Sequence, residues 1–187
     1  MTQQLNGKRI AILATDGVEE VELTEPRKAL QEVGASTEVI APKSGQIRAW
    51  NHTDWGDSIS VDRTLDQADP GEYDALLLPG GVMNPDHLRL DERAVNFVRA
   101  FFQAQKPVAS ICHGPWMLVE ADVARGRKVT SYPSLKTDLR NAGAEWVDEQ
   151  VVVDRGLVTS RKPDDLPAFI EKTIEEVAEG VHHSAPV

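Results

Sequence analysis

Short apolar runs alternate along this chain with longer segments in which apolar residues recur at helical spacing. A short, uninterrupted apolar run of about 4–8 residues is typical of a strand that is buried on both faces, as in a parallel sheet. Such runs predict strands at 9–14, 36–41, 75–78 and 107–111. Two further runs, at 151–154 and 157–160, predict a hairpin around Arg155-Gly156.

The segments between these runs predict helices. Thr24 is a residue type that caps helices and Pro26 suits a first turn, so we expect the first helix to run from Thr24 to about Val33 and to stop at Gly34. Asp91 is expected to cap the next helix. The expected helices after the first are 91–105, 115–122, 134–141 and 163–179, with a short strand at 129–130.

This alternation of strands and helices predicts an α/β domain with a mainly parallel sheet and helices on both faces. No internal repeat or linker interrupts the chain. We therefore expect a single domain over 1–187, with its core at about 8–180 and a frayed tail at 181–187. The turn-rich stretch 42–64 is expected to be a loop with one short strand near 58–61.

Composition narrows the range of partners. The 187 residues carry a formal net charge of −10 and contain no cluster of Lys and Arg. A nucleic-acid surface needs clustered basic side chains to neutralise phosphates, so no nucleic-acid partner is expected. No apolar run approaches the ~20 residues of a membrane helix, and no apolar leader precedes the first strand, so we expect a cytoplasmic location without membrane contact.

Cys112 is the one cysteine, and it lies where the apolar run 107–111 breaks and Gly114-Pro115 opens a helix. This turn has the layout of a nucleophile elbow, and a helix N-terminus beside a sulfur atom stabilises the thiolate. We therefore expect a reactive thiol with a depressed pKa and a strained backbone. The competing interpretation is a buried structural cysteine, because free cysteine is among the most buried residue types.

Other groups are expected at the same carboxyl edge of the sheet. His113 is a candidate base, or else a histidine bonded to local backbone at a helix start. Gly80 and Gly81 close the strand 75–78, where their backbone N–H groups are candidates to bind an oxyanion, or else form a flexible strand exit. Glu19, after the first strand, either complements a helix dipole or reaches the sulfur. No metal-ligand spacing and no nucleotide loop is present, so no metal and no cofactor are expected.

Several motifs together resemble the ThiJ/PfpI family, and within it the PfpI branch of intracellular proteases that are also described as deglycases. The similarity extends from about residue 9 to residue 179. It implies a flavodoxin-like three-layer α/β/α sandwich that is related to class I glutamine amidotransferases. The motifs that carry it are Ala109-Ser110-Ile111-Cys112-His113-Gly114-Pro115, Leu78-Pro79-Gly80-Gly81, Thr130-Ser131-Tyr132-Pro133, Asn141-Ala142-Gly143-Ala144-Glu145-Trp146-Val147-Asp148 and Glu19-Glu20-Val21-Glu22-Leu23.

The resemblance also implies roles for single residues. It makes Cys112 the nucleophile, Glu19 the buried carboxyl beneath the sulfur, and His113 the base. The third member of the triad in this branch is a Glu from a neighbouring subunit, and the matching position here is Asp86, a shorter acid in a segment one residue longer. A solvated loop or helix cap is the competing interpretation of Asp86. A homodimer or higher homo-oligomer with the active site near the subunit interface is therefore implied.

Two rival folds lack the residues that they need. A glutamine amidotransferase and an α/β-hydrolase both require a histidine downstream of the nucleophile. The histidines after His113 are His182 and His183, both in the expected tail. A His113 that is completed by another chain is therefore the simplest arrangement.

Three functions remain open, in this order. The first is a stress-response hydrolase or lyase that acts on oxo-aldehydes such as methylglyoxal, or on their protein and nucleotide adducts, as a glyoxalase or deglycase. The second is an intracellular cysteine peptidase, with the N–H groups of Gly81 and His113 binding the oxyanion. The third is a non-enzymatic oxidative-stress sensor or chaperone that uses Cys112. A long groove past Trp116 and Tyr132 would favour peptides, and a small cup would favour aldehydes.

Overall fold

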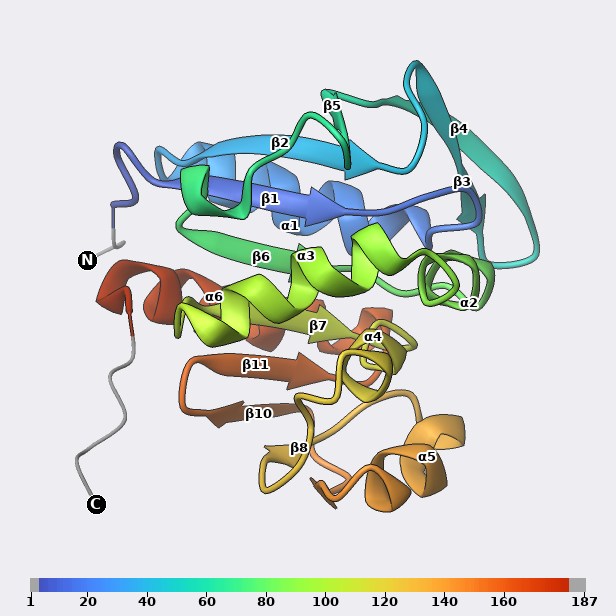
Figure 1. The fold of residues 1–187 in the computed structure, drawn as a ribbon, viewed down its shortest axis with the longest axis vertical. Helices are drawn as coiled ribbons and strands as arrows, with labels where there is room; N and C mark the ends of the chain where they lie inside the picture. Colours follow the sequence, from blue (N-terminus) through green and yellow to red (C-terminus); the bar gives the residue numbers. More distant parts are fainter. Residues whose placement is uncertain (1–3, 182–187) are drawn as a thin grey trace.

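A seven-stranded sheet forms the centre of the computed structural model, which describes residues 4–181 (Figure 1). The strand order is β10-β11-β7-β6-β1-β2-β5, and every neighbouring pair is parallel except β10 with β11. The sheet confirms the predicted strands and the predicted hairpin. Its strands are β1 (Arg9–Leu13), β2 (Ser36–Ala41), β5 (Arg63–Thr64), β6 (Ala75–Leu78), β7 (Val108–Ile111), β10 (Val151–Asp154) and β11 (Leu157–Ser160).

Helices cover both faces of this sheet because the side chains of each central strand alternate between two cores. In β1, Ile10 and Ile12 belong to one core, while Ala11 and Leu13 belong to the other. One core is covered by α1 and α6 and the other by α3 and α4 (Figure 1). These helices are α1 (Glu20–Glu32), α3 (Glu92–Gln103), α4 (Trp116–Glu120) and α6 (Leu166–Glu179). The expected three-layer α/β/α sandwich is confirmed.

Two small sheets lie outside the main one. They are β3 (Gln46–Asn51) with β4 (Asp54–Ser60), and β8 (Lys128–Val129) with β9 (Glu145–Trp146). The stretch 42–64 is therefore a hairpin followed by β5, and the expectation of a loop with one short strand is wrong. The sequence pattern hides β4 because Ile59 is its single buried residue, so most of the strand is polar or exposed on both faces.

Helix α1 begins at Glu20, earlier than the expected cap at Thr24, and Pro26 lies inside it. Pro26 is tolerated there because its fixed φ suits a helix, although it provides no N–H to the helical ladder. The extended residue Glu19 is the N-cap. The early start places Glu22 in the first turn of α1, which decides the chemistry described below.

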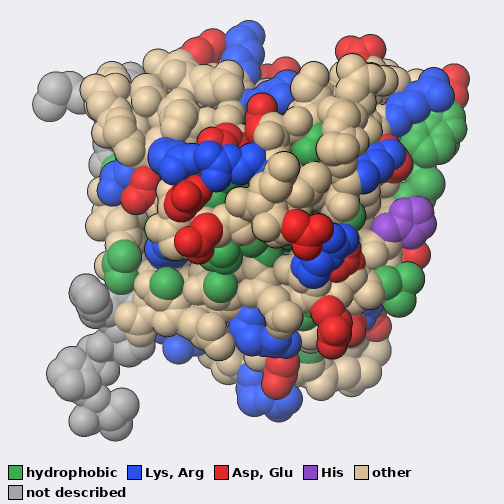
Figure 2. Space-filling model, turned by 45° about the horizontal axis from the view of Figure 1, so that its top comes forward, with side chains coloured by type: hydrophobic (Ala, Val, Ile, Leu, Met, Phe, Trp, Pro, Cys, Tyr) green, Lys and Arg blue, Asp and Glu red, His purple; other side chains and the backbone are tan. Residues whose placement is uncertain are grey.

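Two short helices, α2 (Met83–Leu88) and α5 (Lys136–Asn141), complete the fold, and α2 was not predicted. On the face shown in Figure 2, Lys and Arg side chains are interspersed with Asp and Glu and form no single basic patch. No helix within residues 4–181 is long and apolar enough to cross a membrane. The tail predicted at 181–187 falls, apart from its first residue, outside the described residues.

Candidate active site

Cys112 follows β7 directly and has a left-handed backbone, with φ of 62°. This conformation costs a residue with a side chain about 1–2 kcal/mol, so the surroundings must enforce it. Cys112 donates its N–H to the Ser160 carbonyl at 3.0 Å, and its own carbonyl accepts the Tyr132 N–H at 2.9 Å. The strained backbone that was expected at this residue is confirmed.

Two glycines allow neighbouring backbone to approach the thiol closely. A Cβ atom on Gly80 would lie 2.7 Å from the Cβ of Cys112 and 2.6 Å from a carboxyl oxygen of Glu22. A Cβ atom on Gly114 would lie 2.4 Å from a carbonyl oxygen of β6. No side chain fits at these distances, so both positions require glycine.

Asn84, at the start of α2, fixes the turn that carries Gly80. Its amide nitrogen donates to the carbonyls of Pro79 and Gly80 at 3.0 and 3.1 Å. Its amide oxygen accepts the N–H of Thr15 at 2.8 Å. This buried side chain therefore ties the end of β6 to the end of β1, a role that the sequence did not reveal.

The carboxyl group beside the sulfur belongs to Glu22, and the expectation that Glu19 holds this place is wrong. Glu22 is fully buried beside the Cys112 thiol, its Oε1 accepts the N–H of Gly80 at 3.1 Å, and its Oε2 has no hydrogen-bond partner within residues 4–181. Burial, reinforced by the charge of Glu19, raises the pKa of Glu22 to about 8. At neutral pH Glu22 is therefore mostly protonated and has a proton to donate to sulfur.

Glu19 is directed instead toward the β3–β4 hairpin. Its Oε1 accepts the backbone N–H of His52 at 3.1 Å and lies 3.4 Å from the Nδ1 of the same residue. The error lies in the choice of glutamate within the motif Glu19-Glu20-Val21-Glu22-Leu23 that carries the family resemblance. With α1 beginning at Glu20, the first-turn residue that points under β6 and β7 is Glu22 rather than Glu19.

The Cys112 thiol is held in its protonated form, contrary to the expectation of a depressed pKa. Burial raises the pKa of Cys112, and the charge of Glu22 raises it further when that carboxyl ionises. The backbone N–H groups of Gly81 and His113 donate toward the sulfur and oppose this shift. Helix α4 begins only at Trp116 and is short, so its dipole gives the sulfur less help than expected.

His113 is placed to take the thiol proton. Its Nδ1 lies 3.2 Å from the sulfur of Cys112, and its Nε2 lies 3.3 Å from the hydroxyl oxygen of Ser134. Burial lowers the pKa of His113, so the ring is neutral at physiological pH. When Nδ1 accepts the S–H proton, the ring proton is on Nε2, where Ser134 accepts it. Ser134 was not predicted as a site residue.

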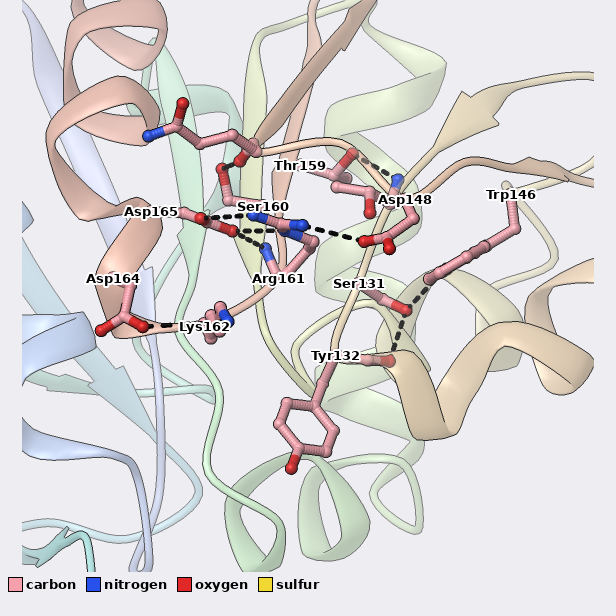
Figure 3. Close-up of polar contacts among 12 residues, drawn as sticks. Ser131, Tyr132, Trp146, Asp148, Thr159, Ser160, Arg161, Lys162, Asp164 and Asp165 are labelled. Atoms are coloured by element: carbon pink, nitrogen blue, oxygen red, sulfur yellow. Dashed lines mark hydrogen bonds and ion pairs between the residues drawn. The ribbon is translucent and has the colours of Figure 1, made fainter.

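Aromatic rings fix the plane of the His113 imidazole. The Tyr132 ring stacks on it at 4.8 Å, and Trp116 meets it edge-on at 5.3 Å. The Tyr132 backbone is held from behind, because Trp146 donates to the Ser131 hydroxyl at 2.9 Å and that hydroxyl donates to the Tyr132 carbonyl at 2.8 Å (Figure 3). The four-residue motif at 130–133 thus positions the base.

The thiol opens into a pocket of about 470 Å³ that is partly open to solvent. Tyr132 lines this pocket, whereas Trp116 contacts the His113 ring and is not part of the lining. Pro163 forms part of the wall, and an ion-pair clamp fixes its loop: Arg161 binds Asp165 at 2.9 and 3.0 Å and Asp148 at 2.9 Å (Figure 3). The lining residues are Gly17, Glu19, Glu22, Trp50, His52, Gly81, Val82, Met83, Cys112, His113, Tyr132 and Pro163.

Comparison with known proteins agrees with this geometry. The model of the DJ-1/PfpI family matches residues 8–176. The chain belongs to the DJ-1/PfpI family. It is 47% identical over 163 residues to Protein/nucleic acid deglycase 2 of Escherichia coli strain K12, and the match covers 87% of this chain and 93% of that protein. It is 44% identical over 170 residues to General stress protein 18 of Bacillus subtilis strain 168, covering 90% and 96%.

Solved structures of the DJ-1/PfpI family have the same fold. The crystal structure of Drosophila melanogaster DJ-1beta matches this chain with a TM-score of 0.83 and 29% sequence identity. The match covers 91% of this chain and 90% of that one. The family resemblance read from the motifs is therefore confirmed, together with the sandwich that it implied.

Fewer backbone N–H groups than expected are available to bind an oxyanion at this DJ-1/PfpI site. The N–H groups of Gly81 and His113 donate toward the Cys112 sulfur, so they are the candidates to bind an oxyanion on a carbon bonded to that sulfur. The N–H of Gly80 already donates to Glu22. The expectation of an oxyanion role for Gly80 is therefore wrong, and this glycine serves close packing.

Asp86 is exposed on α2, shortly after Val82 and Met83, which line the pocket. Within its own chain it does not reach the His113 ring, whose nitrogens face Cys112 and Ser134. A triad role for Asp86 therefore requires a second copy of the chain.

Proposed function

We propose that this protein is a cysteine-dependent deglycase. Its substrates are the adducts that oxo-aldehydes such as methylglyoxal form with protein and nucleotide amines. The observation that carries the proposal is the 3.2 Å contact between the Cys112 sulfur and the His113 Nδ1, in a pocket of about 470 Å³ with two backbone N–H groups near the sulfur. The Escherichia coli relative, which is named a deglycase, supports the same chemistry.

The first step exchanges a carbon–nitrogen bond for a carbon–sulfur bond. A methylglyoxal adduct of an amine is an aminocarbinol, in which one carbon bears both the hydroxyl and the nitrogen. Attack by the Cys112 sulfur on this carbon forms the S–C bond and breaks the C–N bond. The thiol proton passes to His113 Nδ1 and then to the departing nitrogen. The step yields a free amine and a hemithioacetal on Cys112.

The second step is an internal redox isomerisation and needs no external oxidant. A proton moves from the carbon bonded to sulfur to the neighbouring carbonyl carbon. The first carbon is thereby oxidised to a thioester while the second is reduced to an alcohol. Water then hydrolyses the thioester to lactate and regenerates the thiol, with the N–H groups of Gly81 and His113 stabilising the oxyanion. Free methylglyoxal enters the same sequence by direct addition of the thiol.

Glu22 stabilises the negative charge that develops on the buried Cys112 sulfur during attack. An ionised carboxylate next to the sulfur would repel a thiolate, but the raised pKa of about 8 keeps Glu22 protonated at neutral pH. A protonated Glu22 donates its hydrogen to the sulfur as negative charge develops there. The thiolate therefore forms during attack, when His113 removes the proton, and not in the resting protein.

Two observations favour this function over the alternatives. The Escherichia coli relative that is 47% identical to this chain is named a deglycase, which favours the deglycase over the peptidase. Oxidation to sulfenic acid requires an accessible thiolate. Cys112 is 8% exposed and its pKa is raised, which disfavours the stress sensor.

The proposal includes a homo-oligomer in the cytoplasm, where a free thiol stays reduced. In it, Asp86 of one copy approaches the His113 ring of another and orients it, as the family resemblance implied. Support comes from the exposure of Asp86 beside two pocket-lining residues and from the absence of any carboxylate bonded to the His113 ring within residues 4–181.

A side-by-side assay tests the function. The wild type and Cys112→Ser are given casein or a methylglyoxal adduct of Nα-acetyl-lysine amide, and both peptide cleavage and amine release are followed. The proposal predicts amine release by the wild type alone and no cleavage of casein beyond the Cys112→Ser control. Cysteine-dependent casein cleavage without amine release would identify a peptidase instead.

A further inference from the structure

A carboxyl–imidazole pair, separate from the thiol–imidazole pair of Cys112 and His113, lines the active-site pocket, and the chemistry above does not use it. Glu19 and His52 both line the pocket that contains Cys112 and His113. The two pairs come from different elements: Cys112 and His113 follow β7, whereas Glu19 precedes α1 and His52 lies in the turn of the β3–β4 hairpin. The Nδ1 of His52 lies 3.4 Å from the Oε1 of Glu19. The Nε2 of His52 is therefore the ring nitrogen that can contact a ligand.

Hydrogen bonds hold the backbone of the hairpin turn, and the His52 side chain, which is 61% exposed, lines the pocket. Trp50 forms a bridge to Glu19 and donates its N–H to the Val18 carbonyl at 2.7 Å. The indole nitrogen of Trp50 donates to the His52 carbonyl at 2.9 Å, and His52 has a left-handed φ of 55°. A non-glycine residue in this conformation indicates that the surroundings impose the geometry.

Glu19 has acceptor capacity left over. The side chain is 12% exposed, and its Oε1 takes both contacts from His52. Within residues 4–181 no protein group donates a hydrogen bond to Oε2. A mostly buried carboxylate with one unused oxygen favours a positively charged donor, because a charge-assisted hydrogen bond offsets the cost of burying it.

We propose that Glu19 and His52 form a subsite for the basic nitrogen of glycated lysine and arginine side chains. This inference rests on the proposed deglycase function and adds the two residues that bind the substrate nitrogen. The nitrogen that departs in the first step leaves as a neutral amine or guanidine, which takes up a further proton from water at neutral pH and becomes an ammonium or guanidinium group. The Glu19 carboxylate stabilises that positive charge, while the His52 imidazole, oriented by Glu19, accepts a hydrogen bond from it. Free dicarbonyls have no nitrogen and make no use of the subsite.

The kinetic test compares two substrates within each variant. Glu19→Gln keeps an oxygen acceptor for the His52 N–H but removes the charge. The ratio of kcat/KM for the lysine adduct to kcat/KM for free methylglyoxal is expected to fall about tenfold or more in Glu19→Gln, since a hydrogen bond to a charged group is lost. Thr53→Ala, in the same hairpin turn, is the matched control and should keep the wild-type ratio. An unchanged ratio in Glu19→Gln would overturn the subsite.

A binding test separates this inference from the proposed function. In the Cys112→Ser background, calorimetry measures binding of Nα-acetyl-lysine amide and of Nα-acetyl-norleucine amide, which has the same stem without the nitrogen. We expect Glu19→Gln to weaken binding of the lysine compound about tenfold and to leave the norleucine compound unaffected. Equal effects on both compounds, or on neither, contradict the subsite. If the wild type turns over no adduct but the lysine compound binds in a Glu19-dependent way, the deglycase function fails and the cation subsite stands.

Discussion

The Glu22 carboxyl lies beside the Cys112 thiol in the lining of the pocket, and burial raises the pKa of both groups. In the resting protein at neutral pH, Cys112 is therefore a protonated thiol beside a protonated Glu22. The neutral His113 ring at 3.2 Å is the base that removes the thiol proton when a substrate carbon is in place. The reactive thiolate of Cys112 therefore forms only as the sulfur attacks the substrate carbon.

The pH dependence of alkylation tests the raised thiol pKa. Iodoacetamide reacts with the thiolate, so the wild-type rate is expected to inflect above the free-cysteine value of about 8.5. In Glu22→Gln the inflection should move to lower pH, because no carboxylate charge opposes the thiolate. Glu19→Gln is the comparison variant and should produce a smaller movement, since Glu19 is the weaker of the two charges acting on Cys112. A wild-type inflection at or below 8.5 would contradict this description.

The stability of the protein should fall as pH rises from about 5 to 8, and Glu22 should be a cause. Its pKa is raised from 4.5 to about 8, so in this range the folded state binds more protons than the unfolded chain. Stability is then lost with rising pH, by up to roughly 1 kcal/mol per pH unit from this group. Urea unfolding of the wild type and of Glu22→Gln at several pH values measures this loss of unfolding free energy.

The difference between these two proteins is the informative quantity, because the other titrating groups are common to both. The buried His113 has a lowered pKa and acts in the opposite direction at acidic pH. A wild-type-minus-variant difference that stays constant between pH 5 and 8 would show that Glu22 is not the buried acid.

Gly80 should be intolerant of even a methyl group. In Gly80→Ala the new Cβ would lie 2.6 Å from a Glu22 oxygen and 2.7 Å from the Cys112 Cβ, so either the acid or the nucleophile must move. We expect loss of most activity, with destabilisation of about 1–3 kcal/mol from overpacking. Gly71→Ala is the matched control, because the nearest atom to its Cβ, at 3.2 Å, is on the side chain of Asp69. Equal activity in both variants would refute the close-packing role.

Subunit complementation tests the proposed role of Asp86. Cys112→Ser and Asp86→Ala are each expected to be inactive or nearly so. If Asp86 acts across a two-fold interface, half of randomly assembled dimers are mixed, and each has one intact site of two. An equal mixture should therefore recover about a quarter of the wild-type activity per site. A mixture no more active than its components would show that Asp86 does not act in trans.

Local signals were enough to locate the nucleophile but not its acid. The apolar strand that breaks at Cys112 and the glycine after it are adjacent in sequence, so the elbow could be predicted. The family resemblance placed the buried acid in the motif Glu19-Glu20-Val21-Glu22-Leu23 but did not decide which glutamate it is. That choice depends on where the helix begins, because a start at Glu20 places Glu22 in the first turn.

Other parts of the site depend on contacts between distant segments. Ser134 reaches His113 across 21 positions of sequence, and His52 reaches Glu19 across 33. Neither contact leaves a periodic pattern that a single sequence reveals. The hairpin that carries His52 was itself hidden, because the exposed polar residues of β4 lack the alternation of a half-buried strand.

Mass spectrometry of a quenched reaction tests the central claim most directly. The wild type is mixed with a methylglyoxal adduct of Nα-acetyl-lysine amide in single-turnover amounts, quenched in acid at short times, and digested for peptide mapping. A hemithioacetal or thioester that carries the three-carbon unit of methylglyoxal is predicted on Cys112, appearing together with free amine and disappearing as lactate forms. Release of amine and lactate at wild-type rates by Cys112→Ser, or a three-carbon unit carried by another residue during turnover, would contradict the account.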